Sequence, residues 1–292
     1  MPTPAPDFEI TVELVTRLVA DQHPDLAHLP IHGRVEGWDN VSMRLGDSLA
    51  VRLPRRRIAI ELAEREQAFL APIAELIDIG VPAPVRLGVG AADYPAQWGI
   101  VPWFDGESAA LSPPSPQTAA PLGRALSAIH APSPDGLTVS PYRGLPLTER
   151  LDVRRDRLAA AADTFQRLGF STSAVWETWG PLALTPIDVA PVFVHGDLHP
   201  RNVLTDAGEI VAIIDWGDMT PGDPATDLSA VWSLFDRDAH EQFWAGYGPV
   251  SPATHHRTKA WAIYFAVLWI ADAGDVEEFL EMGRQTLGRL LP

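Results

Sequence analysis

The chain has 292 residues, of which 46% are hydrophobic and 21% charged, and its 38 acidic and 22 basic residues give a formal net charge of −16. This length exceeds that of one average domain, and the acidity argues against a nucleic-acid partner, so we expect a soluble globular protein with two lobes. The chain has no cysteine, which excludes disulfides and thiolate metal sites and fits a cytoplasmic location, and its longest apolar run, residues 260–271, is too short for a membrane span.

The first part of the chain predicts one helix followed by an antiparallel sheet. Residues 11–20 have the pattern of an amphipathic helix. Residues 31–38, 42–45 and 48–53 have the pattern of strands, and their short connections imply antiparallel pairing. The three arginines at 55–57 are interpreted as a solvated strand exit.

A helix with one apolar face is predicted over residues 58–79. That face consists of Leu62, Phe69, Leu70, Ile73, Leu76 and Ile77. Glu66 lies in the same stripe, and a buried carboxylate is costly unless a cation pairs with it. Arg52, in the preceding strand, is the expected partner, whereas the alternative places Glu66 on an exposed helix rim.

The rest of the chain predicts two more strands and then a mainly helical region. Strands are expected over residues 85–90 and 98–101. Helices are expected over residues 118–130, 158–168, 175–179, 226–235, 239–247, 252–271 and 275–291, together with one that Thr148 caps. Asp218 is interpreted as an exposed loop carboxylate, with a metal or substrate contact as the alternative.

The segment over residues 194–215, V-H-G-D-L-H-P-R-N-V-L-T-D-A-G-E-I-V-A-I-I-D, contains Asp197, Asn202 and Asp215. A hairpin about the turn at residues 206–209 returns Asp215 to the neighbourhood of Asn202, and Asp197 precedes them on a loop. One proton acceptor then lies beside two oxygen ligands for a hard cation. This arrangement suits phosphoryl transfer from a nucleotide, which needs Mg²⁺ on the phosphates and a carboxylate that orients the acceptor hydroxyl.

This segment and the one after it resemble the aminoglycoside phosphotransferase family, which has a protein-kinase-like fold and the macrolide phosphotransferases as near relatives. The resembling residues are His195-Gly196-Asp197 with Asn202, then Ile214-Asp215-Trp216, then residues 222–228. The resemblance implies an α+β, two-lobed protein-kinase-like fold. It has a small antiparallel-sheet N-lobe over residues 1–103 and a larger, mainly helical C-lobe over residues 104–292, with a hinge over residues 101–106.

The resemblance also implies roles in the C-lobe. Asp197 is expected to be the catalytic base, Asn202 and Asp215 to bind Mg²⁺, and Asp227 to brace the catalytic loop. His195 is interpreted as a structural hydrogen-bonding residue, with a chemical role as the alternative.

For the N-lobe, the resemblance implies a binding site for ATP or GTP. Arg52 occupies the position of a phosphate-holding lysine, with Glu66 as its partner, and the planar arginine fork is not equivalent to a lysine. Residues 37–42 occupy the position of a phosphate-covering loop, to which Asn40 and Ser42 contribute. A plain hairpin loop would have much the same sequence.

The hinge is expected to meet the nucleotide base through backbone groups. Pro102 has no N–H, so it offers only its carbonyl, and the amide of Trp103 or Phe104 is the expected donor. Trp103 as a core residue is the alternative.

The predicted activity is transfer of the γ-phosphoryl group of ATP or GTP to a hydroxyl of a small molecule. An aminoglycoside is the leading acceptor, because the resemblance and the acidic charge both favour a cationic partner. A macrolide is the second candidate, and a metabolic sugar or amino-alcohol kinase is the third. A catalytically silent nucleotide-binding module is the alternative from another class, and the oligomeric state is left open.

Overall fold

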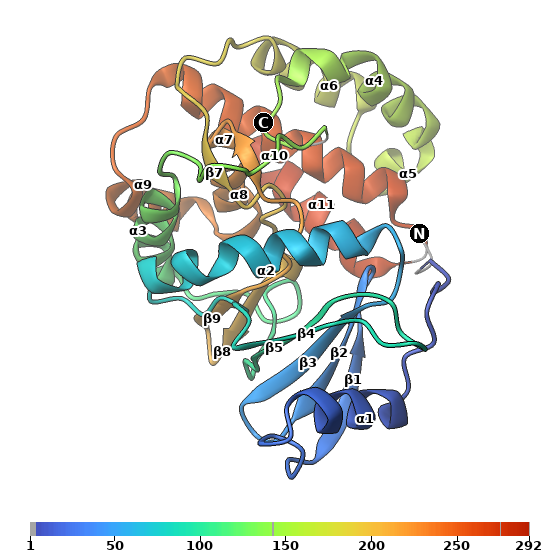
Figure 1. Ribbon diagram of the computed structural model, residues 1–292. Helices are drawn as coiled ribbons and strands as arrows, with labels where there is room; N and C mark the ends of the chain where they lie inside the picture. Colours follow the sequence, from blue (N-terminus) through green and yellow to red (C-terminus); the bar gives the residue numbers. More distant parts are fainter. Residues whose placement is uncertain (1–3, 142, 275, 292) are drawn as a thin grey trace. The chain divides into compact units, whose positions relative to one another are not determined.

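The computed structural model describes residues 4–141, 143–274 and 276–291. The chain divides into two compact units, one that ends at Asp105 and one that begins at Gly106 (Figure 1). The first contains an antiparallel sheet and the second is mainly helical, so the predicted α+β composition is confirmed. The predicted start of the last helix, residue 275, lies outside the described residues.

The first unit is built on a five-stranded antiparallel sheet in the order β1-β2-β3-β5-β4. Its strands are β1 (Ile31–Glu36), β2 (Asn40–Leu45), β3 (Leu49–Pro54), β4 (Arg86–Gly88) and β5 (Trp98–Pro102). The antiparallel pairing predicted from the short connections is therefore confirmed. The loop predicted over residues 37–42 is shorter, because β2 already begins at Asn40, which pairs with Pro54 across the sheet.

Two helices flank this sheet, α1 (Val12–Gln22) and α2 (Ala59–Leu76). Side chains of α1 form a core with one face of the sheet, where Val51 and Leu53 are fully buried. Because successive strand residues point to opposite faces, Arg52 lies on the other face, and there it contacts α2. The alternation of β3 thus determines which helix receives the arginine.

The buried face of α2 differs from the predicted one. Its buried residues are Ala59, Ala63, Glu66, Leu70 and Ile73. Leu76, which was expected on this face, is 53% exposed, and the helix ends there rather than at residue 79. Leu70 and Ile73 are buried as predicted and Glu66 keeps its predicted place in the stripe, but Ala59 and Ala63 rather than Leu62 and Leu76 complete the buried face.

The arginines at 55–57 are not simply a solvated strand exit. Arg55 is 3% exposed, and its Nη2 lies 2.6 Å from Glu36 Oε1, while its Nη1 donates to the carbonyl of Gly37. Arg56 Nη1 lies 2.9 Å from Asp39 Oδ1. Arg57 is exposed as expected, but the interpretation was wrong for Arg55 and Arg56, whose side chains fold back and fix the turn between β1 and β2.

The second unit surrounds the long helix α10 (Pro252–Asp272), drawn in red in Figure 1. Its other α-helices are α3 (Ala119–Ile129), α4 (Leu151–Ala160), α5 (Ala162–Arg167), α6 (Thr172–Ala183), α7 (Ala225–Leu228), α8 (Ala230–Leu234), α9 (Arg237–Tyr247) and α11 (Glu277–Leu290). Residues of α10 are buried on all sides and form one core with Trp179 of α6 and Leu287 of α11. Within the described residues, no helix combines the length and apolar character needed to cross a bilayer.

Several predicted helices have different boundaries. The helix expected over residues 158–168 is divided between α4 and α5 at Ala161, and the one expected over residues 175–179 lies within the longer α6. The helix expected over residues 226–235 is divided into α7 and α8 at Ser229, whose hydroxyl donates to the carbonyl of Thr226 at 2.6 Å. Such local bonds compete with regular helical pairing. Thr148 lies inside a 3₁₀ turn, η2 (Leu147–Arg150), and not at a helix cap.

Short strands of the second unit position the motif. The strands β6 (Glu107–Ser108), β8 (Val203–Asp206) and β9 (Glu209–Ile213) form a three-stranded sheet, and β7 (Val192–Val194) pairs with β10 (Thr220–Gly222). In the β8–β9 hairpin, Val203 lies opposite Ile213. The hairpin predicted from the sequence is confirmed.

Candidate active site

The loop after β7 is fixed by the buried carboxylate of Asp227. Its Oδ2 accepts a hydrogen bond from the backbone N–H of His195 at 2.6 Å, and its Oδ1 accepts one from the N–H of Gly196 at 2.9 Å. Asp227 is fully buried, so its charge depends on such donors. These bonds hold the backbone directly before Asp197.

The imidazole of His195 has the structural hydrogen bonds predicted for it. Its Nδ1 accepts from the backbone N–H of Asp197 at 3.2 Å, which leaves Nε2 as the protonated nitrogen that donates to the carbonyl of Ile214 at 3.0 Å. The ring is fully buried, with its centroid 4.6 Å from that of the Trp216 ring. His195 therefore ties the loop that contains Asp197 to the strand end before Asp215.

Glycine is required at position 196. Its φ is +87°, and a Cβ atom there would lie 2.4 Å from the carbonyl oxygen of Asp218. Both the backbone conformation and the close approach exclude a side chain. Gly196 thus allows the segment after Asp215 to lie against the loop after β7.

The hairpin brings the three residues of the motif together. The backbone N–H of Ile214, directly before Asp215, donates to the carbonyl of Asn202 at 2.9 Å. The Nδ2 of Asn202 donates to the carbonyl of Asp197 at 3.0 Å, so its Oδ1 is the polar atom that remains for a cation. Asp215 is exposed and has φ +62°, a conformation uncommon outside glycine and enriched at functional sites.

The carboxylate of Asp197 lies in a strongly polar environment. Its Oδ1 is 2.7 Å from Nη2 of Arg143, and its Oδ2 is 3.5 Å from Nε2 of His199. Burial raises the pKa of the Asp197 carboxyl, but the charge of Arg143 and the charge and hydrogen bond of His199 outweigh it, so this pKa lies well below its usual range. Asp197 is therefore ionised at neutral pH and able to accept a proton.

The sequence interpretation missed Arg143 and misplaced Asp218. Asp218 is only partly exposed, and its Oδ2 lies 3.0 Å from Nη2 and 3.1 Å from Nε of Arg143. Burial raises the pKa of Asp218, and the neighbouring charge of Asp197 adds to this rise against the opposing effect of Arg143. Arg143 lies in an irregular loop rich in proline and glycine, where no periodicity signals a partner.

In the first unit, the predicted ion pair between Arg52 and Glu66 is present. Nη1 of Arg52 lies 3.0 Å from Oε2 of Glu66, and the two side chains are 15% and 7% exposed. Both line a small pocket together with Asn40 and Gln67. Ser42 lies opposite Arg52 on the neighbouring strand but is not among the residues that line this pocket.

Two acceptor atoms in this pocket lack partners. Within the described residues, Oδ1 of Asn40 and Oε1 of Gln67 are buried and make no hydrogen bond. A buried acceptor without a donor is costly, so both atoms favour a ligand that supplies N–H or O–H groups. Gln67 was missed because a single glutamine beside a buried helix stripe has no distinctive sequence signal.

The hinge prediction is corrected in part. The backbone N–H of Trp103 donates to the carbonyl of Ser48 at 2.8 Å, so it is already used within the first unit. Its indole N–H donates to Asp105, and the guanidinium of Arg44 lies over its ring at 5.3 Å. Trp103 is half-buried rather than a core residue. The carbonyl of Pro102 and the amide of Phe104 remain the candidate groups for a base.

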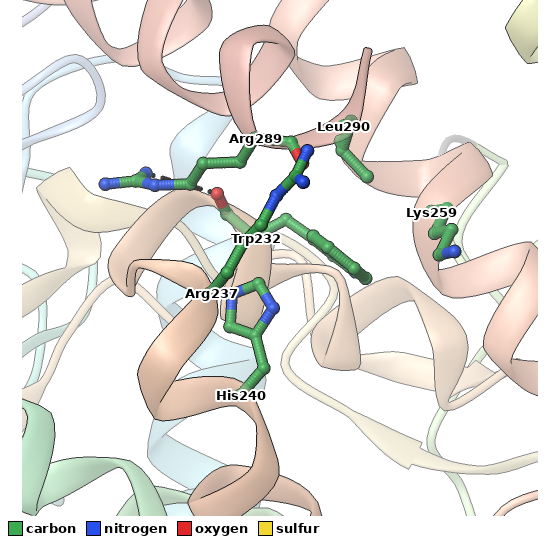
Figure 2. A pocket seen from close by; sticks show the side chains of 6 residues that line it. All are labelled: Trp232, Arg237, His240, Lys259, Arg289 and Leu290. Atoms are coloured by element: carbon green, nitrogen blue, oxygen red, sulfur yellow. Dashed lines mark hydrogen bonds between the residues drawn. The ribbon is translucent and has the colours of Figure 1, made fainter. Parts of the chain in front are cut away.

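A separate basic pocket lies in the second unit (Figure 2). Its cavity of about 320 Å³ is lined by Trp232, Arg237, His240, Lys259, Arg289 and Leu290. Arg237 donates to the backbone carbonyl of Arg289, and the Arg289 guanidinium lies 2.9 Å from Asp236. None of the predicted site residues lines this cavity, so the motif at residues 194–215, rather than the cavity of Figure 2, defines the candidate active site.

Comparison with sequence families and curated proteins gives two matches. The model of the phosphotransferase enzyme family (APH) matches residues 31–261. An uncharacterized protein, YcbJ, of Bacillus subtilis (strain 168) is 26% identical over 200 residues, which cover 63% of this chain. The match spans 62% of the length of that protein, which is less than two thirds.

Solved structures share the fold. A mutant of aminoglycoside 2'-phosphotransferase-IIIa in its GDP complex is 16% identical, with a TM-score of 0.69 and coverage of 95% of this chain and 98% of that one. Macrolide 2'-phosphotransferase type I is 23% identical, with a TM-score of 0.58 and coverage of 95% and 98%. The fold is thus the kinase-like fold that the resemblance implied, and the chain belongs to the phosphotransferase enzyme family.

Proposed function

We propose that this protein transfers the γ-phosphoryl group of ATP or GTP to a hydroxyl group of a small molecule. The observation that carries the proposal is the arrangement of the motif, in which the hairpin and the amide of Asn202 gather Asp197, Asn202 and Asp215. The kinase-like fold and the family membership agree with it. The proposal assigns nucleotide binding to the first unit and catalysis to the second, with the boundary within residues 101–106.

Asp197 is the proposed catalytic base. The acceptor oxygen forms a bond to the γ-phosphorus, the bond from that phosphorus to the β–γ bridging oxygen breaks, and the hydroxyl proton passes to the Asp197 carboxylate. The lowered pKa of Asp197 makes it a weak base. It suits a loose transition state, in which the carboxylate chiefly orients the hydroxyl and receives its proton late.

Asn202 and Asp215 are the proposed Mg²⁺ ligands. An amide oxygen and an exposed carboxylate fit a hard cation, and Mg²⁺ is commonly held by one or two protein carboxylates together with substrate phosphates. When bound, this ion would neutralise charge on the donor phosphates. The Nδ2 bond from Asn202 to the carbonyl of Asp197 orients the amide oxygen without help from the ion.

The proposed nucleotide site uses the pair of Arg52 and Glu66. Glu66 fixes the guanidinium, which keeps its charge for phosphate oxygens, and Asn40 in the same pocket offers an acceptor. Ser42 and the hinge groups of Pro102 and Phe104 complete the proposed contacts. A similar fold binds GDP in the aminoglycoside enzyme, which supports GTP beside ATP as donor.

The proposed acceptor is an aminoglycoside first and a macrolide second. The net charge of −16 favours a cationic partner, and both kinds of enzyme share this fold. A silent nucleotide-binding module is disfavoured, because Asp197, Asn202 and Asp215 are all present and lie together.

Mass spectrometry tests the proposed function directly. The protein is incubated with MgATP or MgGTP and a panel of aminoglycosides, macrolides and common sugars, and each acceptor is examined for the mass of one added phosphoryl group. The expected result is a mass increase for at least one acceptor that EDTA abolishes. Tight nucleotide binding without transfer to any acceptor in the panel would support the silent module instead.

A further inference from the structure

The guanidinium of Arg143 lies between two carboxylates of the candidate active site. Its Nη2 is 2.7 Å from Oδ1 of Asp197 and 3.0 Å from Oδ2 of Asp218, and its Nε donates to Asp218 at 3.1 Å. The side chain is 15% exposed, with the guanidinium carbon 5.5 Å from the centroid of the Phe265 ring. A cation of the protein itself therefore occupies the space beside the proposed catalytic base.

The backbone on both sides of this arginine is attached to the region of β10. The N–H of Ser140 donates to Oγ1 of Thr220 at 2.8 Å. The carbonyl of Gly144 accepts from the N–H of Asp223 at 3.2 Å. Gly144 also packs so closely on Gly222 that a Cβ atom there would lie 2.7 Å from the Gly222 Cα. Ser140 and Gly144, on either side of Arg143, are therefore held against the region of β10.

Withdrawal of Arg143 would leave two adjacent carboxylates without their shared cation. Breaking a largely buried ion pair by removing one partner is strongly unfavourable. An ammonium group of the acceptor could take this place only by replacing the three contacts of the Arg143 guanidinium with the two carboxylates. It would also have to disrupt the backbone bonds that attach the neighbouring residues to β10. The lower-energy outcome is that Arg143 stays and the acceptor binds next to it.

We infer that Arg143 is a specificity-determining residue, which selects a reacting hydroxyl with no ammonium group on the neighbouring carbon atoms. The two carboxylates offset the charge of Arg143 at a distance, but an ammonium group in direct contact with the guanidinium is repelled by it, whereas neutral hydroxyl and ether oxygens accept hydrogen bonds from a guanidinium. The inference rests on the proposed function and narrows its acceptor. Within an aminoglycoside, it favours a hydroxyl remote from the amino groups.

Three other acidic residues with partners in the second unit illustrate how arginines offset its acidity. Asp236 pairs with Arg289, Asp272 with Arg157, and Glu278 with Arg201. The acidic composition of the chain therefore does not place an unmatched carboxylate at these positions.

Binding measurements that need no phosphoryl transfer test the inference. Kanamycin and its fully N-acetylated form share hydroxyls but differ in charge, and their affinities are measured by calorimetry for wild type, Arg143→Gln, Arg143→Lys and Arg284→Gln. Arg284 pairs with Glu281 on the exposed side of α11 and serves as the matched control. Melting temperatures verify that each variant is folded.

The expected result is that Arg143→Gln binds kanamycin at least about tenfold more tightly than wild type and binds the acetylated form no more tightly. Arg143→Lys and Arg284→Gln should keep the wild-type ratio of affinities. Tighter binding of both ligands by Arg143→Gln would show that the arginine merely blocks Asp197, and this overturns the inference. The inference is also overturned if Arg143→Gln binds kanamycin no more tightly than wild type does. Absence of measurable kanamycin binding by both wild type and Arg143→Gln counts as this outcome.

The phosphorylated product gives a second test that uses wild type alone. The inference expects NMR to locate the phosphate on a hydroxyl without an amino group on an adjacent carbon. A phosphate beside an amino group contradicts it. Absence of transfer to every acceptor contradicts the proposed function instead and leaves the binding comparison in force.

Discussion

Each unit contains a largely buried arginine that binds an acidic residue of the candidate site, but the supports of the two arginines differ. Arg52 lies on β3 and contacts Glu66 on α2, so both partners belong to regular elements. Arg143 belongs to the loop between α3 and η2, and Asp197 and Asp218 are loop residues as well. The first pair depends on strand and helix geometry, whereas the second depends on the few contacts that fix three loops.

The charge balance also differs. Arg52 and Glu66 form a one-to-one pair, which is neutral as a unit. Arg143 faces two carboxylates, so this cluster keeps a net negative charge when both are ionised. The first unit therefore offers a cation fixed by one carboxylate, which the proposed function assigns to the anionic donor, and the second offers carboxylates whose charge Arg143 balances only in part.

The largest effect is expected for Asp197→Asn, which removes the proposed base from the loop cluster. We expect kcat for phosphoryl transfer to fall by about 10²- to 10⁴-fold, because the amide accepts no proton, with little change in the KM for nucleotide. Both kcat and the KM for nucleotide are measured by steady-state kinetics with the acceptor that mass spectrometry identifies. Asp163→Asn, on an exposed helix position, is the control. Activity within a factor of three of wild type would remove Asp197 from this role.

A smaller effect is expected for Arg52→Met, which breaks the strand-to-helix pair. We expect the KM for nucleotide to rise by about 10- to 100-fold, since a hydrogen bond to a charged group contributes about 1.5–3 kcal/mol. Arg52→Lys should recover part of this loss, because it restores the charge but not the planar fork. The KM for nucleotide of both variants is measured by titrating the nucleotide at a saturating concentration of acceptor. If Arg52→Met changed kcat alone, the first unit would not hold the donor phosphates as proposed.

The loop support of the cluster is tested by Gly196→Ala against Gly136→Ala. Both glycines have nearly the same φ, +87° and +88°, but a Cβ at Gly196 meets the carbonyl of Asp218 at 2.4 Å and one at Gly136 meets nothing within 4 Å. Each variant should lose roughly 1–2 kcal/mol of unfolding free energy for the left-handed conformation. Gly196→Ala should lose about 1–3 kcal/mol more for the overlap. Urea unfolding measures both, and equal losses would show that the loops adapt freely.

The smallest effect is expected for Arg17→Gln, which breaks an exposed pair with Asp93. These side chains are 43% and 60% exposed, against 15% and 7% for Arg52 and Glu66. We expect a loss below about 0.5 kcal/mol in unfolding free energy, because solvent screens exposed ion pairs. The unfolding free energies of Arg17→Gln and Arg52→Met are both measured by urea unfolding. If the two variants lost equal amounts, burial would not distinguish the two ion pairs.

The sequence determined the elements whose pattern is local. The alternation of β3 and the stripe of α2 were sufficient to pair Arg52 with Glu66, and the turn at residues 206–209 was sufficient to bring Asp215 back to Asn202. Periodicity and turn chemistry act over a few residues, so they can be recognised in the chain itself. The kinase-like fold was implied by the resemblance of this motif to the aminoglycoside phosphotransferase family.

The tertiary structure alone decided the contacts between irregular segments. It placed Arg143 between Asp197 and Asp218, used the amide of Trp103 within the first unit, and buried Arg55 against the turn between β1 and β2. No periodic sequence pattern signals these contacts. A loop backbone has no repeating geometry, and its side chains contact residues that are distant in the sequence. For this protein, regular elements position Arg52 and Glu66 and bring Asn202 and Asp215 together, whereas loop contacts position Asp197 and decide its electrostatic environment.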